Sequence, residues 1–141
     1  EMVTERYLLR SSKEWIARKE ACSILDSILE AFANSNVKEV AELVTRNFFG
    51  PITTIIPWAT NRYTETLISR VKSHFGPSKF WGFWMLGGMS GGGMGFIFDP
   101  DAKAEALEVL PGLMRTVKGE MDDALPFAMD PVVYDFEINE R

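Results

Sequence analysis

The chain has 141 residues, 46% of them hydrophobic and 25% charged, which are the proportions of a single globular domain and exclude intrinsic disorder. Its net charge of −5 and its lack of any run of Lys or Arg argue against nucleic-acid binding. The sequence has 1 cysteine and 1 histidine, which excludes an internal disulfide and leaves no Cys/His cluster for a metal site.

The start of the chain predicts a cytoplasmic location. Glu1 precedes Met2, which indicates a piece of a longer protein, and no signal-peptide pattern follows.

One uncharged stretch, Phe80 to Phe98, approaches the length of a membrane helix. It is rich in glycine, and each glycine destabilises a helix interior by about 1 kcal/mol relative to alanine. We therefore expect two short strands and a loop there, and no membrane contact.

The first half of the chain predicts helices. Ser11 and Glu14 have the spacing of a capping box and predict a helix from about 13 to 33. Its apolar residues recur at helical spacing: Ile16, Ala17, Ala21, Ile24, Leu25, Ile28 and Phe32. Asn36, with Glu39 three residues later, predicts the start of a second helix. That helix should end near Gly50-Pro51, because the residue before proline avoids the helical region.

The next stretch, Ile52 to Ala59, predicts an irregular segment or a short helix, since it contains Pro57. A third helix should begin at Thr60 or Asn61 and end at Gly76-Pro77-Ser78. One face of it carries the apolar residues Tyr63, Leu67, Ile68, Val71 and Phe75.

The second half predicts strands around one further helix. Phe80 to Leu86 is aromatic and predicts a strand buried on both faces, and Met94 to Phe98 predicts a second strand. Asp99-Pro100 predicts a helix start, with the acid as cap and the proline at the first helical position. Pro111 should kink or split that helix. Apolar residues then alternate with other residues and predict a half-buried final strand: Val132, Tyr134, Phe136 and Ile138.

This order of elements predicts an α+β fold with an antiparallel sheet and helices packed on one face of it. The strand–loop–strand–helix–strand end resembles part of a ferredoxin-like unit.

The loop between the two central strands is the most unusual feature of the sequence, since six of the nine residues from Gly87 to Gly95 are glycine. Such a loop can offer bare amides to an anion, or it can let another segment pack closely against it. It lacks the Gly-Lys-Ser/Thr ending of a Walker A loop and the G-x-G-x-x-G spacing of a dinucleotide site. The spacing alone favours a flexible hairpin loop.

The segment Met85 to Phe96 resembles the C-terminal glycine-rich motif of the GHMP small-molecule kinases, the family of galactokinase, homoserine kinase and mevalonate kinase. That motif usually reads as an apolar strand, Gly-Ala-Gly-Gly-Gly-Gly and a second apolar strand. Met89-Ser90 departs from it, because the family has a small pair there. Residues upstream of the loop also match the family: Asn47, Trp58-Ala59-Thr60, Glu65, Leu67 and Ile68. The likeness covers about residues 10–121 and is nearest to the fucokinase and heptose-kinase branch.

The resemblance implies that residues 1–141 are a ferredoxin-like C-terminal lobe of an ATP-dependent carbohydrate kinase. Its partners would be the N-terminal lobe of the same parent chain and a sugar substrate. ATP and Mg²⁺ belong to the full-length parent, and none is expected in the fragment, which should hold no catalytic residue and be inactive alone. The residues implied to support the phosphate and substrate loop are Gly87, Gly88, Ser90, Gly91, Gly92 and Gly93.

A sugar pocket is a second hypothesis, built on Asn47, Trp58 and Asn61, because aromatic rings stack on sugar faces and amides bind hydroxyls. The alternative interpretation of this region, which the residues favour, is a solvated loop anchored by one buried tryptophan. A further alternative for the whole chain is a non-catalytic α+β module for ligand sensing or dimerisation, since no acid–base constellation is evident. The sequence is compatible with a homo-oligomer.

Other conspicuous residues have structural interpretations. His74 should lie half exposed at a helix end, where its charge suits the helix dipole. Cys22 should be a small core residue. Trp81 and Trp84 should lie on opposite faces of one strand, and Asp122-Asp123 should be solvated.

Overall fold

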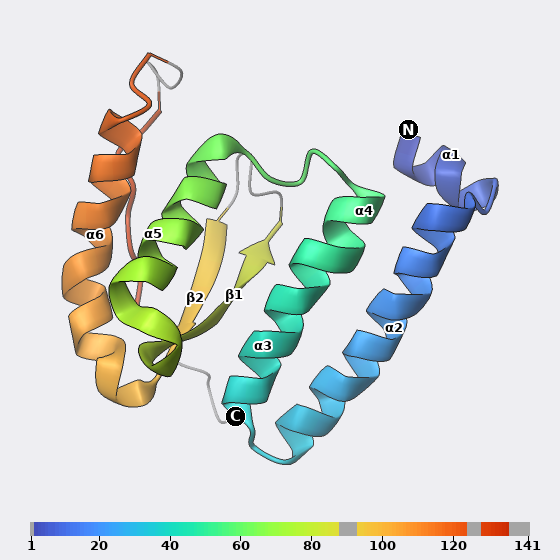
Figure 1. Ribbon diagram of the computed structural model, residues 1–141, viewed down its shortest axis with the longest axis horizontal. Coiled ribbons are helices and arrows are strands. Elements are labelled where there is room, and N and C mark those ends of the chain that lie inside the picture. Colours follow the sequence, from blue (N-terminus) through green and yellow to red (C-terminus); the bar gives the residue numbers. More distant parts are fainter. Residues whose placement is uncertain (1, 88–92, 124–127, 136–141) are drawn as a thin grey trace. The chain divides into compact units, whose positions relative to one another are not determined.

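The computed structural model describes residues 2–87, 93–123 and 128–135, and these form a mostly helical α+β protein whose two-stranded antiparallel sheet packs against helices (Figure 1). The predicted α+β class is confirmed at this level. Contacts divide the chain into two compact units, which are described separately. The first is Glu1–Asn61 with Trp81–Ile97, and the second is Arg62–Phe80 with Phe98–Arg141.

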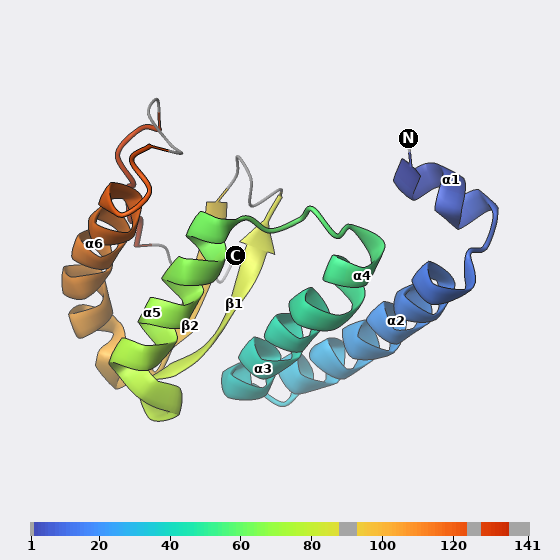
Figure 2. The ribbon, with the colours of Figure 1, turned by 45° about the horizontal axis from the view of Figure 1, so that its top comes forward.

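The helices of the first unit lie in the N-terminal half of the chain. They are α1 (Met2–Leu8), α2 (Ser12–Ala33), α3 (Val37–Asn47), a π-helical turn η1 (Phe48–Ile52) and the short α4 (Thr53–Ile55). α2 and α3 lie side by side as an antiparallel pair (Figures 1 and 2). The predicted cap of α3 is confirmed. The Asn36 side chain accepts a hydrogen bond from the Glu39 amide at 3.2 Å and donates one to the Glu39 carboxylate at 2.8 Å.

The hairpin consists of β1 (Phe80–Leu86) and β2 (Gly93–Phe98), and both predicted strands are confirmed. β1 is buried at Phe80, Gly82 and Phe83 and half-buried at its two tryptophans, whereas Leu86 at its end is exposed. Burial on both faces therefore holds for the first part of the strand only. Phe83 is fully buried and meets the ring of Phe48 edge to face, with centroids 5.2 Å apart.

The second unit pairs α5 (Arg62–Lys79) with α6 (Lys103–Gly119), which the 3₁₀ turn η2 (Pro100–Ala102) precedes. The predicted stop of the third helix is confirmed, because Gly76 leaves the helical region with φ 70° and ψ 171°. Asp99 caps the turn before α6 by accepting a hydrogen bond from the Asp101 amide at 2.9 Å, also as predicted. Of the apolar face predicted for α5, Tyr63 is half-buried and the other four residues are buried: Leu67, Ile68, Val71 and Phe75. The buried residues of α6 in the same unit include Ala106, Leu110 and Val117.

Two local predictions in the first unit are wrong. Ser11 makes no side-chain cap at the start of α2. The other half of the capping box is missing as well, because the Glu14 carboxylate binds the Arg6 guanidinium at 2.6 Å and the Ser11 amide donates to the Arg6 carbonyl oxygen at 3.1 Å. The second helix does not end at Gly50-Pro51 but continues through η1 into α4. Gly50 lacks the Cβ that normally clashes with a following proline, and the wider π-helical turn accommodates the missing donor of Pro51.

In the second unit, part of one prediction and the whole of another are wrong. Pro111 was expected to kink or split the helix, and α6 runs through it without a split. The side chains that it buries can offset the roughly 3 kcal/mol that an internal proline costs. The described part of the predicted last strand, residues 132–135, has no regular structure, and Val132 and Tyr134 are 60% and 81% exposed. Phe136 and Ile138 lie outside the described residues.

A physical reason for the missing strand lies in how residues 128–135 are held. Ion pairs of 2.8 Å join Asp130 to Lys118 and Asp135 to Lys103, so the segment follows α6. In the described part of the chain the sheet contains only β1 and β2, and an extended segment becomes a strand only with a hydrogen-bonded neighbour.

Candidate functional site

The described flanks of the glycine-rich loop lie at the open end of the hairpin. Gly87 follows the last residue of β1 and has φ +71°, a left-handed conformation that favours glycine. Gly93 is the exposed first residue of β2. The other residues predicted to support phosphate and substrate lie outside the described residues: Gly88, Ser90, Gly91 and Gly92. The hairpin thus presents the two ends of the loop at its exposed tip.

The base of the hairpin is fixed against α3. A Cβ placed on Gly82 would collide with the backbone carbonyl oxygen of Ala41 and with the hydroxyl of Thr45. The Thr45 hydroxyl also accepts a hydrogen bond of 3.0 Å from the Phe83 amide. Sequence reasoning missed Thr45. The only signal was the spacing of the small residues Ala41 and Thr45, four apart on one face of a helix.

Gly95 has a packing role rather than a role in binding. A Cβ on this residue would lie 2.6 Å from Nε1 and Cε2 of the Trp84 indole, so the absence of a side chain makes room for that ring. Trp81 and Trp84 are both half-buried, and their odd and even positions place them on opposite faces of β1, as expected. Close packing therefore explains Gly82 and Gly95, whereas a Cβ on Gly87 would meet no atom within 4 Å and one on Gly93 none closer than 3.8 Å.

The residues of the predicted sugar pocket come from three segments. Asn47 ends α3, Trp58 lies in the turn after α4, and Asn61 directly precedes α5. The whole of η1 and α4 separates Asn47 from Trp58. Trp58 and Asn61 are three residues apart, and the ring of Trp58 is not buried, because 49% of the residue is exposed. The alternative interpretation of this region, a solvated loop anchored by one buried tryptophan, is therefore wrong about the tryptophan.

Asn47 carries a polar atom that is buried without a partner. Its side-chain oxygen Oδ1 is inaccessible to solvent, and within the described residues no group donates a hydrogen bond to it. Asn47 shares a helix face with Val40, seven residues earlier, which is also buried. A buried acceptor without a donor is rare in proteins and indicates an additional hydrogen-bonding group, such as water or a ligand hydroxyl.

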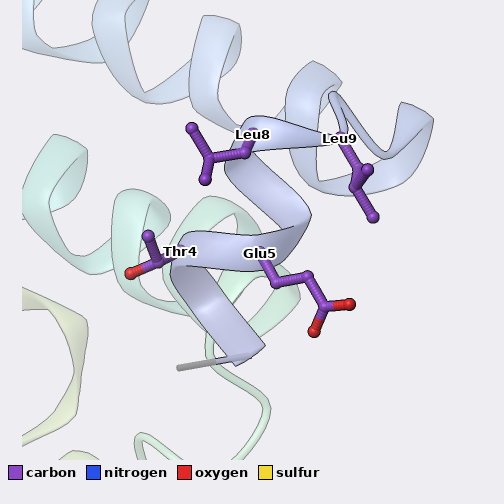
Figure 3. Close-up of a pocket in the computed structure, with 4 residues that line it drawn as sticks. All are labelled: Thr4, Glu5, Leu8 and Leu9. Atoms are coloured by element: carbon purple, nitrogen blue, oxygen red, sulfur yellow. The ribbon is translucent and has the colours of Figure 1, made fainter.

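A surface hollow on α1 holds none of the predicted site residues (Figure 3). It is lined by Thr4, Glu5 and Leu8 of this short helix and by Leu9, which directly follows it. Thr4 and Leu8 project to one side of the helix and Glu5 and Leu9 to the other, as residues four apart do (Figure 3). With a single carboxylate and no second charged group, the hollow has no set of groups that could perform acid–base chemistry.

Two titratable side chains of the second unit, His74 and Tyr63, make contacts with neighbouring groups of the fold. His74 is exposed near the end of the regular part of α5, where it meets the Phe75 ring at 4.7 Å, as expected. Burial raises the pKa of Tyr63, whose hydroxyl donates a hydrogen bond of 3.3 Å to the Met114 carbonyl oxygen. The described residues contain no group of three or more His, Cys, Asp or Glu side chains that could hold a metal ion.

Two further expectations concern exposure. Cys22 is exposed on α2, so its prediction as a core residue is wrong. Asp122 and Asp123 are exposed, as predicted. Across the described part of the chain, no helix is both long enough and apolar enough to cross a bilayer.

Comparison with known proteins adds no further constraint on function. No family model, curated protein or solved structure matches the chain. A proposal for its function therefore depends on the motif in Met85 to Phe96, on the residues upstream of it, and on the geometry given above.

Proposed function

We propose that this chain is the C-terminal lobe of an ATP-dependent carbohydrate kinase of the GHMP type. The observation that carries the proposal is the motif Met85 to Phe96, in which two apolar strands enclose a glycine-rich loop. The hairpin of β1 and β2 is consistent with that motif, because Gly87 and Gly93 mark the ends of the loop at its exposed tip. The proposal includes a ferredoxin-like arrangement for the lobe.

The loop would act through its main chain. The glycines from Gly87 to Gly93 allow a close approach by the phosphate-binding segment of the N-terminal lobe, and Ser90 can add a hydroxyl donor. Kinases of this chemistry work by positioning groups and stabilising charge around the transferred phosphoryl group, which ATP supplies and Mg²⁺ neutralises in the full-length parent. The fragment contributes shape and amides and is not catalytic alone.

Trp58 and Asn61 are the stronger part of the proposed sugar pocket. The exposed ring of Trp58 offers a stacking surface, and Asn61 is close enough in sequence to bond a hydroxyl of the same sugar. The Oδ1 of Asn47 has no hydrogen-bond partner within the described residues, but it is inaccessible to solvent, so a second hydroxyl could reach it only after neighbouring side chains move aside. In this proposal Asn47 joins the pocket only for a ligand that reaches the end of α3.

Calorimetry on the isolated chain tests the division between lobes. Titration with Mg·ATP and with a panel of hexoses should show no tight binding, and an assay for phosphate transfer should show no activity. Tight binding of ATP or of a sugar by this chain alone would contradict the split-lobe proposal and would favour a ligand-sensing module.

A non-catalytic dimerisation module is a second candidate, favoured by one observation. α2 exposes large apolar residues on a face that the described residues of the first unit leave uncovered, among them Leu25, Leu29 and Phe32. A surface of this kind is typical of a binding interface.

A further inference from the structure

α2 carries an exposed apolar stripe made of Cys22, Leu25, Leu29 and Phe32, here called the α2 stripe. The three large residues are 54%, 59% and 54% exposed, and the cysteine is exposed as well. Their spacing of three, four and three residues is that of the contact positions in a two-helix coiled coil. The buried residues of α2, such as Ala17, Ile24 and Ala31, occupy a different face and form the core of the first unit.

α1 covers the N-terminal part of the same side of α2 and ends there. The Tyr7 ring lies 5.8 Å from the Trp15 ring, and the Arg18 guanidinium lies 5.0 Å from the Tyr7 centroid. The stripe begins one turn beyond Arg18 and is left uncovered by α1. Leu8 at the end of α1 and Leu9 directly after it are themselves 72% and 71% exposed.

Charges along one flank of the α2 stripe indicate what covers it. Lys19 lies toward the N-terminal end of this flank, and Asp26 and Glu30 lie toward its C-terminal end. All three are exposed, and within the described residues they form no ion pair. A second copy of α2 running antiparallel would place its Lys19 between Asp26 and Glu30 of the first, and the reverse pair follows by symmetry. A parallel copy would instead turn this flank toward the opposite flank of its partner, which carries none of these three charges.

We propose that two copies of this chain associate through their α2 stripes in an antiparallel arrangement around a two-fold axis. The charge pairing places that axis between Cys22 and Leu25, so Leu25 of each copy packs on Cys22 of the other. Leu29 and Phe32 then extend toward the exposed leucines of the other copy's α1. This interface is independent of the proposed kinase function, because none of its residues belongs to the glycine-rich loop or to the proposed sugar pocket.

Sedimentation equilibrium on the 141-residue chain tests the proposal. We expect a mass of twice 15.9 kDa. Leu25→Glu and Leu29→Glu should each raise the dissociation constant by about 100-fold or more, because a carboxylate would be buried in the seam. Ile16→Glu is the matched control. Ile16 is 64% exposed on α2 but lies away from the stripe, so this variant should remain dimeric. Far-UV circular dichroism should be unchanged in all three.

Charge reversal tests the orientation. Lys19→Glu should weaken association by roughly tenfold and the added changes Asp26→Lys and Glu30→Lys should restore it. Because the chain has 1 cysteine, a short bis-maleimide should join the two Cys22 side chains near the axis into a covalent dimer. In a parallel dimer, adding Asp26→Lys and Glu30→Lys to Lys19→Glu would not restore the strength of association.

Three results would overturn the proposal: a monomer at all concentrations, a dimer that both leucine variants leave intact, or dissociation caused by Ile16→Glu. None of these outcomes bears on ATP or sugar binding, so failure of this proposal and failure of the kinase proposal are distinguishable.

Discussion

The hydroxyl of Thr45 on α3 accepts a hydrogen bond of 3.0 Å from the backbone amide of Phe83 on β1, and it donates one of 3.4 Å to that residue's carbonyl oxygen. This side chain therefore satisfies both polar groups of a residue in the buried part of the hairpin. Beside it, Gly82 allows the strand to approach the helix backbone. Together these contacts fix the base of the arm that carries the glycine-rich loop.

Thr45→Val should destabilise the chain by about 1–3 kcal/mol, because it keeps the shape of the side chain but leaves the amide of Phe83 without its partner. Urea unfolding measures the change. Thr116→Val is the control, since Thr116 is exposed on α6 and bonds only the carbonyl of Gly112, so its effect should stay within about 0.5 kcal/mol. Equal effects of the two substitutions would contradict this account of the hairpin base.

Gly82→Ala should destabilise the chain by roughly 1–3 kcal/mol or more, because the added methyl group meets the backbone of α3 and not a movable side chain. The comparison is Gly112→Ala on α6, where a Cβ meets no atom within 4 Å. That substitution should stabilise the helix by about 0.5–1 kcal/mol. The unfolding free energies of the two variants should therefore move in opposite directions, and a neutral Gly82→Ala would show that α3 and β1 are not in direct contact.

The raised pKa of Tyr63 makes the second unit sensitive to alkaline pH. Below about pH 10 the phenol is neutral in the folded and unfolded chain, so its contribution is complete. Above that pH the unfolded state loses the proton first, and the contribution is lost as the pH rises toward the folded pKa. Urea unfolding between about pH 8 and pH 11 should show a steeper loss of stability in the wild type than in Tyr63→Phe. If the stability of the two proteins fell equally with pH, burial of Tyr63 would not be the cause of the loss.

Several elements could be predicted from the sequence because their signals are local. Asn36 caps α3 through a residue three positions away, and Asp99 caps the turn before α6 through one two positions away. Gly76 ends the regular part of α5 by its own backbone conformation. In each case the interacting groups are neighbours in the chain, so propensity and spacing were sufficient.

The predictions that were wrong depended on distant partners. Arg6 takes the Glu14 carboxylate that a capping box would have used. The exposure of Cys22 depends on which face of α2 meets the rest of the first unit, and helical periodicity does not decide between two adjacent apolar faces. The alternation in residues 132–135 could have predicted a strand correctly only if a neighbouring strand were available to pair with it.

The candidate site was predictable to a different extent in each of its parts. The glycine-rich loop is evident in the sequence, and the left-handed conformation of Gly87 agrees with a need for glycine there. The buried oxygen of Asn47 could not be foreseen, because a helix end that faces the core looks the same in sequence as one that faces solvent. The unsatisfied acceptor appears only when the packing around α3 is known.

The proposed kinase function is tested by replacing Gly92 with valine in the longer chain that the proposal assigns to this fragment. We expect Gly92→Val to leave the far-UV circular dichroism of the 141-residue chain unchanged and to abolish phosphate transfer in the proposed parent, because a branched side chain would block the close approach to the loop. Gly112→Val, on the exposed side of α6, should leave that activity intact. Full activity of the Gly92→Val enzyme would contradict the claim.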